Sequence, residues 1–183
     1  PIIFSKVPES VIAAGAPILR HAHLTSQVDY EAELAVIIGI GGREISQDDA
    51  MKHVWGYTII NDVSARDLQK RHQQWHLAKS LDSFCPMGPW LVSKDELDVS
   101  DTKIKCWVNS ELRQNASTAQ FIFDIPTLIA TISAGITLYP GDIIATGTPS
   151  GVGMGFKPAK FLQSGDRIRI EIHGIGYLEN RVA

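Results

Sequence analysis

The sequence predicts an α+β fold that is mostly β, with a few short helices. Segments rich in β-branched and aromatic residues outnumber the segments with helical patterning. The helical segments are short and do not alternate regularly with strands, which disfavours a doubly wound parallel sheet. A length of 183 residues corresponds to one domain, so we expect residues 1–183 to form a single domain.

Strands are expected where apolar and β-branched residues run between glycine, proline or acidic turn signals. Residues 5–30 are rich in such signals and are expected to be mainly loop. In the first predicted strand, residues 31–38, polar and apolar residues alternate at the start and apolar residues then occupy both faces, as in a strand that enters a core. The predicted strands are residues 31–38, 54–63, 90–93, 103–109, 111–114, 143–145, 167–172 and 177–182.

Helices are expected behind capping residues. Ser46, with Asp49 three residues later, fits a capping box that opens a helix to about residue 53. Ser64 can cap a second short helix that runs to about residue 71. The clearest helix lies between Asp124 and Gly135, with a capping residue, an early proline and a terminal glycine.

Composition excludes several classes of protein. The chain carries 17 Lys and Arg against 20 Asp and Glu, a net charge of −3, without the basic cluster that nucleic-acid binding needs. The longest apolar run, residues 34–40, is far shorter than the roughly 20 residues of a membrane span. Cys85 and Cys106 form no disulfide framework, which indicates a reducing, cytoplasmic compartment. The chain starts at Pro1 within an apparently extended segment, so either the protein is processed or further residues precede Pro1.

Two glycine-rich stretches suggest phosphate sites. After the first strand, residues 39–42 begin a dinucleotide-binding pattern, but Glu44 stands where the third glycine is required. Residues 147–155 lack the Lys-Ser/Thr pair of a P-loop. They form either a flexible surface turn or a rigid loop whose backbone N–H groups, with the Thr148 hydroxyl, face a small anionic ligand.

Three carboxylates lie at strand ends. Glu31 and Glu33 project from one face of their strand, about 7 Å apart along it, and Asp62 ends the next apolar strand. Either these side chains are solvated strand ends, or they form an oxygen-only triad. Such hard ligands suit Mg²⁺, Mn²⁺ or Ca²⁺ and leave positions open for water and substrate.

The other candidate residues each have two interpretations. Lys79 is either a surface lysine or a cation that stabilises an enolate near a bound metal. Arg66 and Gln69 share one helix face, either in solvent or against one ligand. His72 and His76 would suit a metal pair only if one helix spanned both.

The chain resembles the fumarylacetoacetate hydrolase family in four ordered motifs. The resemblance implies a mixed β-roll of the C-terminal type of that family, usually homodimeric, that binds Mg²⁺ or Mn²⁺ through Glu31, Glu33 and Asp62. It also implies that Lys79 is catalytic and that Arg66, Gln69 and Thr148 line the substrate cavity. The motifs are residues 29–39, 61–69, 78–82 and 147–153.

The resemblance implies an enzyme that acts on a short 2-oxo acid through a metal-chelated enolate. C–C bond hydrolysis or decarboxylation, of an acylpyruvate or oxaloacetate, is the main expectation. The alternatives are an isomerase or tautomerase of a 2-hydroxy-dienedioate in aromatic catabolism, and a catalytically silent protein that binds a metal or a dicarboxylate. The family's water-activating His–Glu pair, on a mobile lid, matches nothing in residues 1–183. Either the pair precedes Pro1, or the protein is not a hydrolase of the usual kind.

Overall fold

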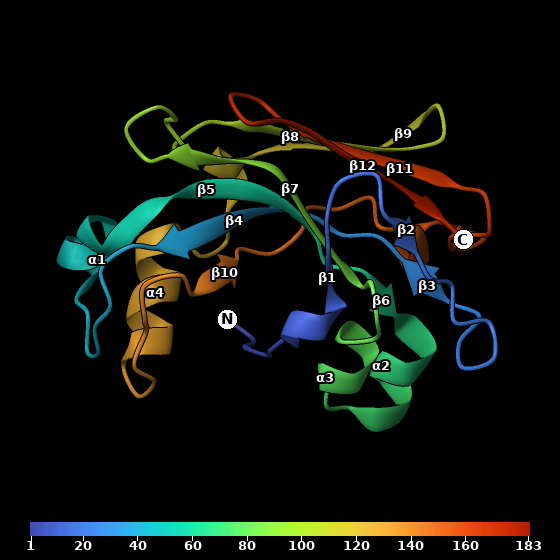
Figure 1. Ribbon diagram of the computed structural model, residues 1–183, viewed down its shortest axis with the longest axis horizontal. Coiled ribbons are helices and arrows are strands. Elements are labelled where there is room, and N and C mark those ends of the chain that lie inside the picture. Colours follow the sequence, from blue (N-terminus) through green and yellow to red (C-terminus); the bar gives the residue numbers. More distant parts are fainter.

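The computed structural model describes residues 1–183 and contains two five-stranded sheets that stack on each other (Figure 1). In spatial order, the first sheet comprises β1 (Val11–Ile12), β7 (Cys85–Ser93), β5 (Val54–Asn61), β4 (Ala32–Ile38) and β10 (Ile143–Ala145). The second comprises β2 (Pro17–Ile18), β12 (Gly176–Val182), β11 (Arg167–Ile172), β8 (Lys103–Val108) and β9 (Glu111–Ser117). A small third sheet pairs β3 (Val28–Asp29) with β6 (Ser64–Ala65).

Four short α-helices surround the sheets, which confirms the predicted mostly-β α+β class. Three 3-10 turns, at Pro8–Ser10, Thr118–Gln120 and Gly153–Gly155, complete the elements. No helix has the length and apolar character needed to cross a membrane. The α-helices are α1 (Gln47–His53), α2 (Arg66–His72), α3 (His76–Lys79) and α4 (Ile125–Ser133).

The core lies between the two large sheets. All seven residues of β4 are buried because β5 and β10 flank the strand and both of its faces are covered. In the second sheet, burial alternates along β11: Ile168, Ile170 and Ile172 are buried, and the residues between them are more exposed. Side chains from both sheets contribute to one cluster of 33 buried apolar residues, while Ala35, Ile60 and Cys85 of the first sheet form a separate cluster of three.

Two predicted helix caps are confirmed and one is wrong. The Ser46 hydroxyl accepts a hydrogen bond from the backbone N–H of Asp49, and the Asp124 carboxylate caps α4 in the same way. Ser64 caps no helix, because Ser64 and Ala65 pair with β3 as strand β6. Ala65 therefore occupies the N-cap position of α2, without a side-chain cap.

Strand β7 begins at Cys85, five residues before the expected start. Pro86 and Pro89 are ordinarily signals against a strand, but the pairing of β7 with β5 is irregular in this region, and prolines are tolerated there. The short strands β1, β2 and β3 and the four-residue helix α3 were not predicted either.

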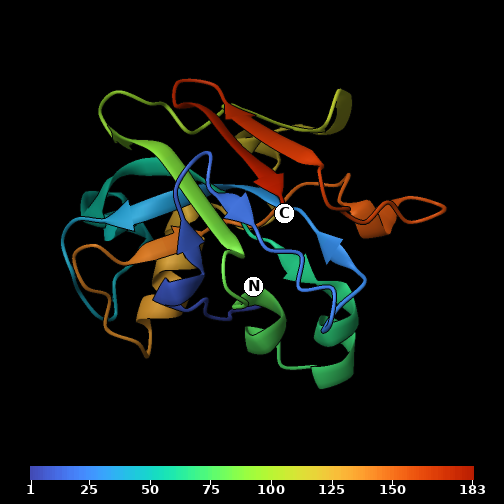
Figure 2. The ribbon, with the colours of Figure 1, turned by 45° about the vertical axis from the view of Figure 1, so that its right-hand side comes forward.

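The N-terminal residues lie between α4 and α3, beside the sheet that contains β4 (Figure 1). The turned view agrees and shows the segment that includes Gly153–Gly155 extending away from the sheets (Figure 2). The N-terminal segment and the start of the segment after β10 both reach the end of β4 where the acidic residues lie.

Candidate active site

The antiparallel pairing of β4 with β5 brings the three predicted carboxylates together. Ala32, between Glu31 and Glu33, pairs with Asn61, which directly precedes Asp62. The Asp62 N–H donates to the carbonyl oxygen of Glu31 at 2.9 Å, which fixes the two chain segments. Carboxylate oxygens of the three acidic residues lie within 4.8 Å of one another. All three residues are buried, so they are not solvated strand ends.

Lys79 lies between two of these carboxylates. Its Nζ donates to Oε2 of Glu31 and to Oδ2 of Asp62, each at 2.7 Å. Burial alone would lower the pKa of Lys79, but the charges of Asp62 and Glu31 raise it above its ordinary value. The residue is 1% exposed, so it is not a surface lysine, and its side chain stays an ammonium.

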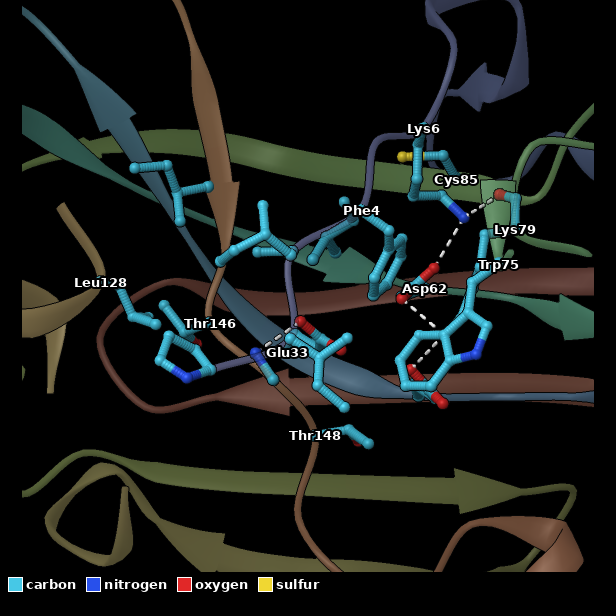
Figure 3. Close-up of a pocket in the computed structure, with 18 of the residues that line it drawn as sticks. Phe4, Lys6, Glu33, Asp62, Trp75, Lys79, Cys85, Leu128, Thr146 and Thr148 are labelled. Carbon is cyan, nitrogen blue, oxygen red and sulfur yellow. Dashed lines mark hydrogen bonds and ion pairs between the residues drawn. The ribbon is translucent and has the colours of Figure 1, made fainter. Parts of the chain in front are cut away.

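Lys6 is a second, partly buried cation of the site, and sequence reasoning missed it. Its Nζ donates to Oδ1 of Asp62 at 2.7 Å and to the carbonyl oxygen of Lys79, as Figure 3 shows. Burial raises the pKa of Asp62, but Lys6 and Lys79 outweigh it and hold that pKa below its ordinary value. A single lysine in a loop-rich segment gives no local sign of this role.

Arg66 is occupied by the chain's own acids. Its Nε donates to Asp29 at 2.9 Å, and Nη1 lies 2.6 Å from Oε1 of Glu31. Nη1 also donates to the amide oxygen of Gln69 at 3.2 Å, which confirms that the two residues share one helix face. Because Arg66 is buried and paired on two sides, the amide nitrogen of Gln69 is the freer donor of the two at the cavity.

Asp29 connects this cluster to the glycine-rich segment, and its role was also missed. Its carboxylate accepts from the backbone N–H groups of Gly153 at 2.6 Å and Met154 at 3.0 Å. A Cβ at Gly153 would lie 2.6 Å from Oδ1 of Asp29 and 2.3 Å from the carbonyl oxygen of Lys160, so only glycine permits this approach. These N–H groups therefore bind a carboxylate of the chain itself rather than a separate anion.

Glu33 is the carboxylate without a cationic partner. Its Oε2 accepts from the backbone N–H of Gly147 at 2.7 Å, and no lysine or arginine pairs with it. Burial, together with the charges of Asp62 and Glu31, raises its pKa well above the ordinary value. Four acids and three basic side chains make up the cluster, so one negative charge is uncompensated.

The donor set of Glu31, Glu33 and Asp62 fits a hard divalent cation. All available ligand atoms are oxygens, and the uncompensated charge at Glu33 is what a bound cation would neutralise. The condition for a metal pair of His72 and His76 is not met, because no single helix spans both: His72 belongs to α2 and His76 to α3. No histidine lines the cavity within residues 1–183.

Thr148 is held by Gln114, a fully buried residue for which no role was predicted. Gln114 Nε2 donates to Oγ1 of Thr148 at 2.8 Å, and Oε1 accepts from the N–H of Ala32 at 3.1 Å. The Thr148 hydroxyl in turn donates to the carbonyl oxygen of Ala32 at 3.0 Å. Gln114 thus connects the strand between the two glutamates to the segment after β10.

The carboxylates open into a cavity of about 2040 Å³ that is polar at this end and largely apolar beyond it. Arg66, Gln69, Lys79 and Thr148 all line it. The Phe4 ring lies edge-on to Trp75 (Figure 3). Nζ of Lys79 lies 5.0 Å from the centre of the Phe4 ring. The arrangement can bind a small anion between the Lys79 ammonium, the Gln69 amide nitrogen and a site for a metal ion.

Comparison with known proteins assigns the chain to a group of enzymes. Residues 1–183 match the family model described as fumarylacetoacetate (FAA) hydrolase C-terminal. Oxaloacetate tautomerase YisK of Bacillus subtilis (strain 168) is 55% identical over 183 residues, which is 100% of this chain and 61% of that protein. The chain therefore spans less than two thirds of the length of this curated relative.

Solved structures agree with this match. A fumarylacetoacetate hydrolase (EaFAH) from Exiguobacterium antarcticum superposes with a TM-score of 0.97 at 52% identity, over 99% of this chain and 65% of that one. A 2-hydroxyhepta-2,4-diene-1,7-dioate isomerase from Mycobacterium marinum gives a TM-score of 0.92 at 42% identity, over 100% and 69% of the two chains. The expected mixed fold with few short helices is thereby confirmed.

Proposed function

The chain belongs to the fumarylacetoacetate hydrolase family of enzymes, and on that premise we propose that it catalyses keto–enol tautomerisation of a short 2-oxo acid, with oxaloacetate as the first candidate. The observation that carries the proposal is the buried triad of Glu31, Glu33 and Asp62, with Nζ of Lys79 2.7 Å from two of its members. Residues 1–183 are proposed as its single metal-dependent catalytic domain.

Proton transfer is favoured over C–C bond hydrolysis or decarboxylation, the main expectation from the sequence. Two of the three relatives described above are named as a tautomerase and an isomerase, and one as a hydrolase. Tautomerisation and isomerisation need a stabilised enolate and a proton that moves between oxygen and carbon, and they consume no water. The cations that surround the triad supply the first of these requirements.

Glu31, Glu33 and Asp62 would hold the divalent cation, with Mg²⁺ or Mn²⁺ as the family-typical choice. When bound, such an ion supplies Lewis-acid polarisation of a 2-oxo group. Lys79, as an ammonium, offsets negative charge that develops on the substrate oxygen. The amide nitrogen of Gln69 is a donor for a substrate carboxylate, and the Thr148 N–H, which makes no hydrogen bond within the chain, is another.

A homodimer in the cytoplasm is part of the proposal. Exposed apolar side chains near α4 and β10 support a second copy as partner, and the two free, buried cysteines suit a reducing compartment. These side chains are Ile122, Phe123, Ile136, Tyr139 and Ile143.

The test uses the full-length protein with Mg²⁺ or Mn²⁺, and then with EDTA. Enol absorbance reports tautomerisation of oxaloacetate, while released CO₂ and C–C cleavage products report the two competing reactions. We expect accelerated, EDTA-sensitive loss of enol absorbance without either product. Lys79→Met should lower kcat while cation binding persists. Cleavage or CO₂ release as the dominant reaction would replace the proposed function, and no turnover of any 2-oxo acid would refute it.

A further inference from the structure

The direction of every hydrogen bond around Thr148 follows from the chemistry of its partners. The N–H of Ala32 can only donate and the carbonyl oxygen of Pro149 can only accept, so the Gln114 amide has one possible orientation. Its Nε2 donates one proton to Pro149 and the other to Oγ1 of Thr148, both at 2.8 Å. The assignment of amide oxygen and nitrogen therefore depends on no adjustable hydrogen position.

The Thr148 hydroxyl has no proton left for a ligand. It accepts from Gln114 and donates its only proton to the carbonyl oxygen of Ala32 at 3.0 Å. A hydroxyl oxygen has two lone pairs, so one acceptor position is unused. Because Thr148 lines the cavity, this oxygen offers ligands a hydrogen-bond acceptor and no donor.

The acceptor lies beside the carboxylate cluster. Gly147, the preceding residue, donates to Glu33, and Ala32 lies between Glu31 and Glu33 in the sequence. The carboxylates of Glu31, Glu33 and Asp62 are the other acceptors at this end, and they would be occupied by the cation that the triad holds. The Lys79 ammonium and the Gln69 amide nitrogen are donors suited to anionic oxygens. Thr148 is thus the group of this set that suits a ligand hydroxyl.

We infer that Thr148 selects ligands that carry a hydroxyl donor, namely an enol or a 2-hydroxy acid, over those with a carbonyl oxygen at the same place. Gln114 is the positioning residue that imposes this choice, because its amide commits the Thr148 proton to Ala32. The inference deepens the proposed function and rests on it for the class of ligand. It predicts that the site binds the enol tautomer more tightly than the keto tautomer.

The test uses lactate and pyruvate, which share a carboxylate and three carbons but carry a hydroxyl and a carbonyl at C2. Calorimetry on the full-length protein loaded with Mn²⁺ measures both affinities. Thr148→Val, which keeps the side-chain shape, should weaken lactate binding about tenfold (~1.4 kcal/mol) and leave pyruvate binding nearly unchanged. Thr148→Ser should restore lactate binding, because serine keeps the hydroxyl.

Gln114→Met tests the positioning role. Without the amide the Thr148 hydroxyl can rotate and donate, so the ratio of lactate to pyruvate affinity should fall toward one. A merely structural role would weaken both probes by the same factor. If this variant does not fold, the Thr148 variants still decide the question. Equal loss of both probes in Thr148→Val, or no loss of either, overturns the inference while wild-type turnover stands. If the wild type binds neither probe, the inference fails, while turnover of oxaloacetate decides the proposed function separately.

Discussion

The ammonium group of Lys6 lies 2.7 Å from Oδ1 of Asp62, opposite the ammonium of Lys79 at 2.7 Å from Oδ2. Both oxygens of one buried carboxylate are therefore bound by lysines from different parts of the chain. This double pairing ties the N-terminal segment to the end of β5, and it makes the position of Asp62 depend on Lys6 as well as on its own strand.

Lys6→Met should destabilise the protein by about 1–3 kcal/mol, since it leaves a buried carboxylate oxygen without its partner. Urea unfolding monitored by circular dichroism measures the change. Lys52→Met is the matched control, because Lys52 pairs with Asp49 on the surface, where such pairs contribute about 0–1 kcal/mol. Equal effects of the two substitutions would contradict the role of Lys6.

Glu33→Gln should abolish the stabilisation of the protein by Mn²⁺. A ligand at about 100 times its Kd adds roughly 2.7 kcal/mol to folding stability, and this gain should vanish with the ligand carboxylate. The metal-free variant should be at least as stable as the wild type, because a buried amide replaces an acid that has no cationic partner. Thermal unfolding with and without Mn²⁺ tests both statements. Glu171→Gln, at a half-exposed pair, is the control.

Asp29→Asn should release the segment around Gly153. The substituted amide keeps one acceptor oxygen but presents N–H donors where Arg66 and the Met154 N–H also donate. Hydrogen exchange of the Gly153 and Met154 amides should accelerate, and stability should fall by about 3 kcal/mol. Glu111→Gln, which removes an exposed contact to Lys160 of the same segment, should leave both amides protected.

Asp67→Asn should lower stability in a pH-dependent way. Burial raises the pKa of Asp67, but hydrogen bonds from the Thr25 hydroxyl and from two backbone N–H groups outweigh it and hold that pKa below its ordinary value. The two N–H groups belong to Ser26 and Leu68. A depressed folded-state pKa contributes stability above the unfolded-state value of about 3.9, and this contribution is lost as pH falls toward the folded-state value.

Urea midpoints at pH 7 and at acidic pH test this sign for Asp67. The difference in urea midpoint between the wild type and the variant should be largest at pH 7 and should shrink as the pH falls below about 4. Asp95, an exposed turn residue without side-chain hydrogen bonds, provides the control substitution Asp95→Asn. A difference that grows with acidity would contradict the prediction.

The parts of the fold and site that the sequence predicts are those with local signals. Hydrophobic alternation predicts β11, capping residues predict α1 and α4, and strand parity predicts that Glu31 and Glu33 share one face. Their meeting with Asp62 needs only that two consecutive strands pair, which neighbouring strands commonly do.

The missed parts depend on distant segments. Lys6 reaches Asp62 across 56 residues, and Gln114 reaches Ala32 across 82. A lone lysine in a loop and a glutamine in a strand have no local pattern that announces such contacts. The two-residue strands form only where a segment distant in the sequence pairs with them. β1 and β2 pair with the longer strands β7 and β12, whereas β6 pairs with the equally short β3, and this pairing displaced the expected Ser64 cap.

The register between β4 and β5 limits which changes of length are tolerated in the connector between them, residues 39–53. Side chains alternate along a strand, so a shift by one residue would turn Glu33 to the opposite face and bring Ala32 to the position of a ligand. The irregularity in this pairing lies between Ile37 and Ile38, at the end of β4 far from the carboxylates. Insertions in the connector can be absorbed there, whereas an odd-numbered shift past Ile37 would dismantle the acidic cluster even in a stably folded chain.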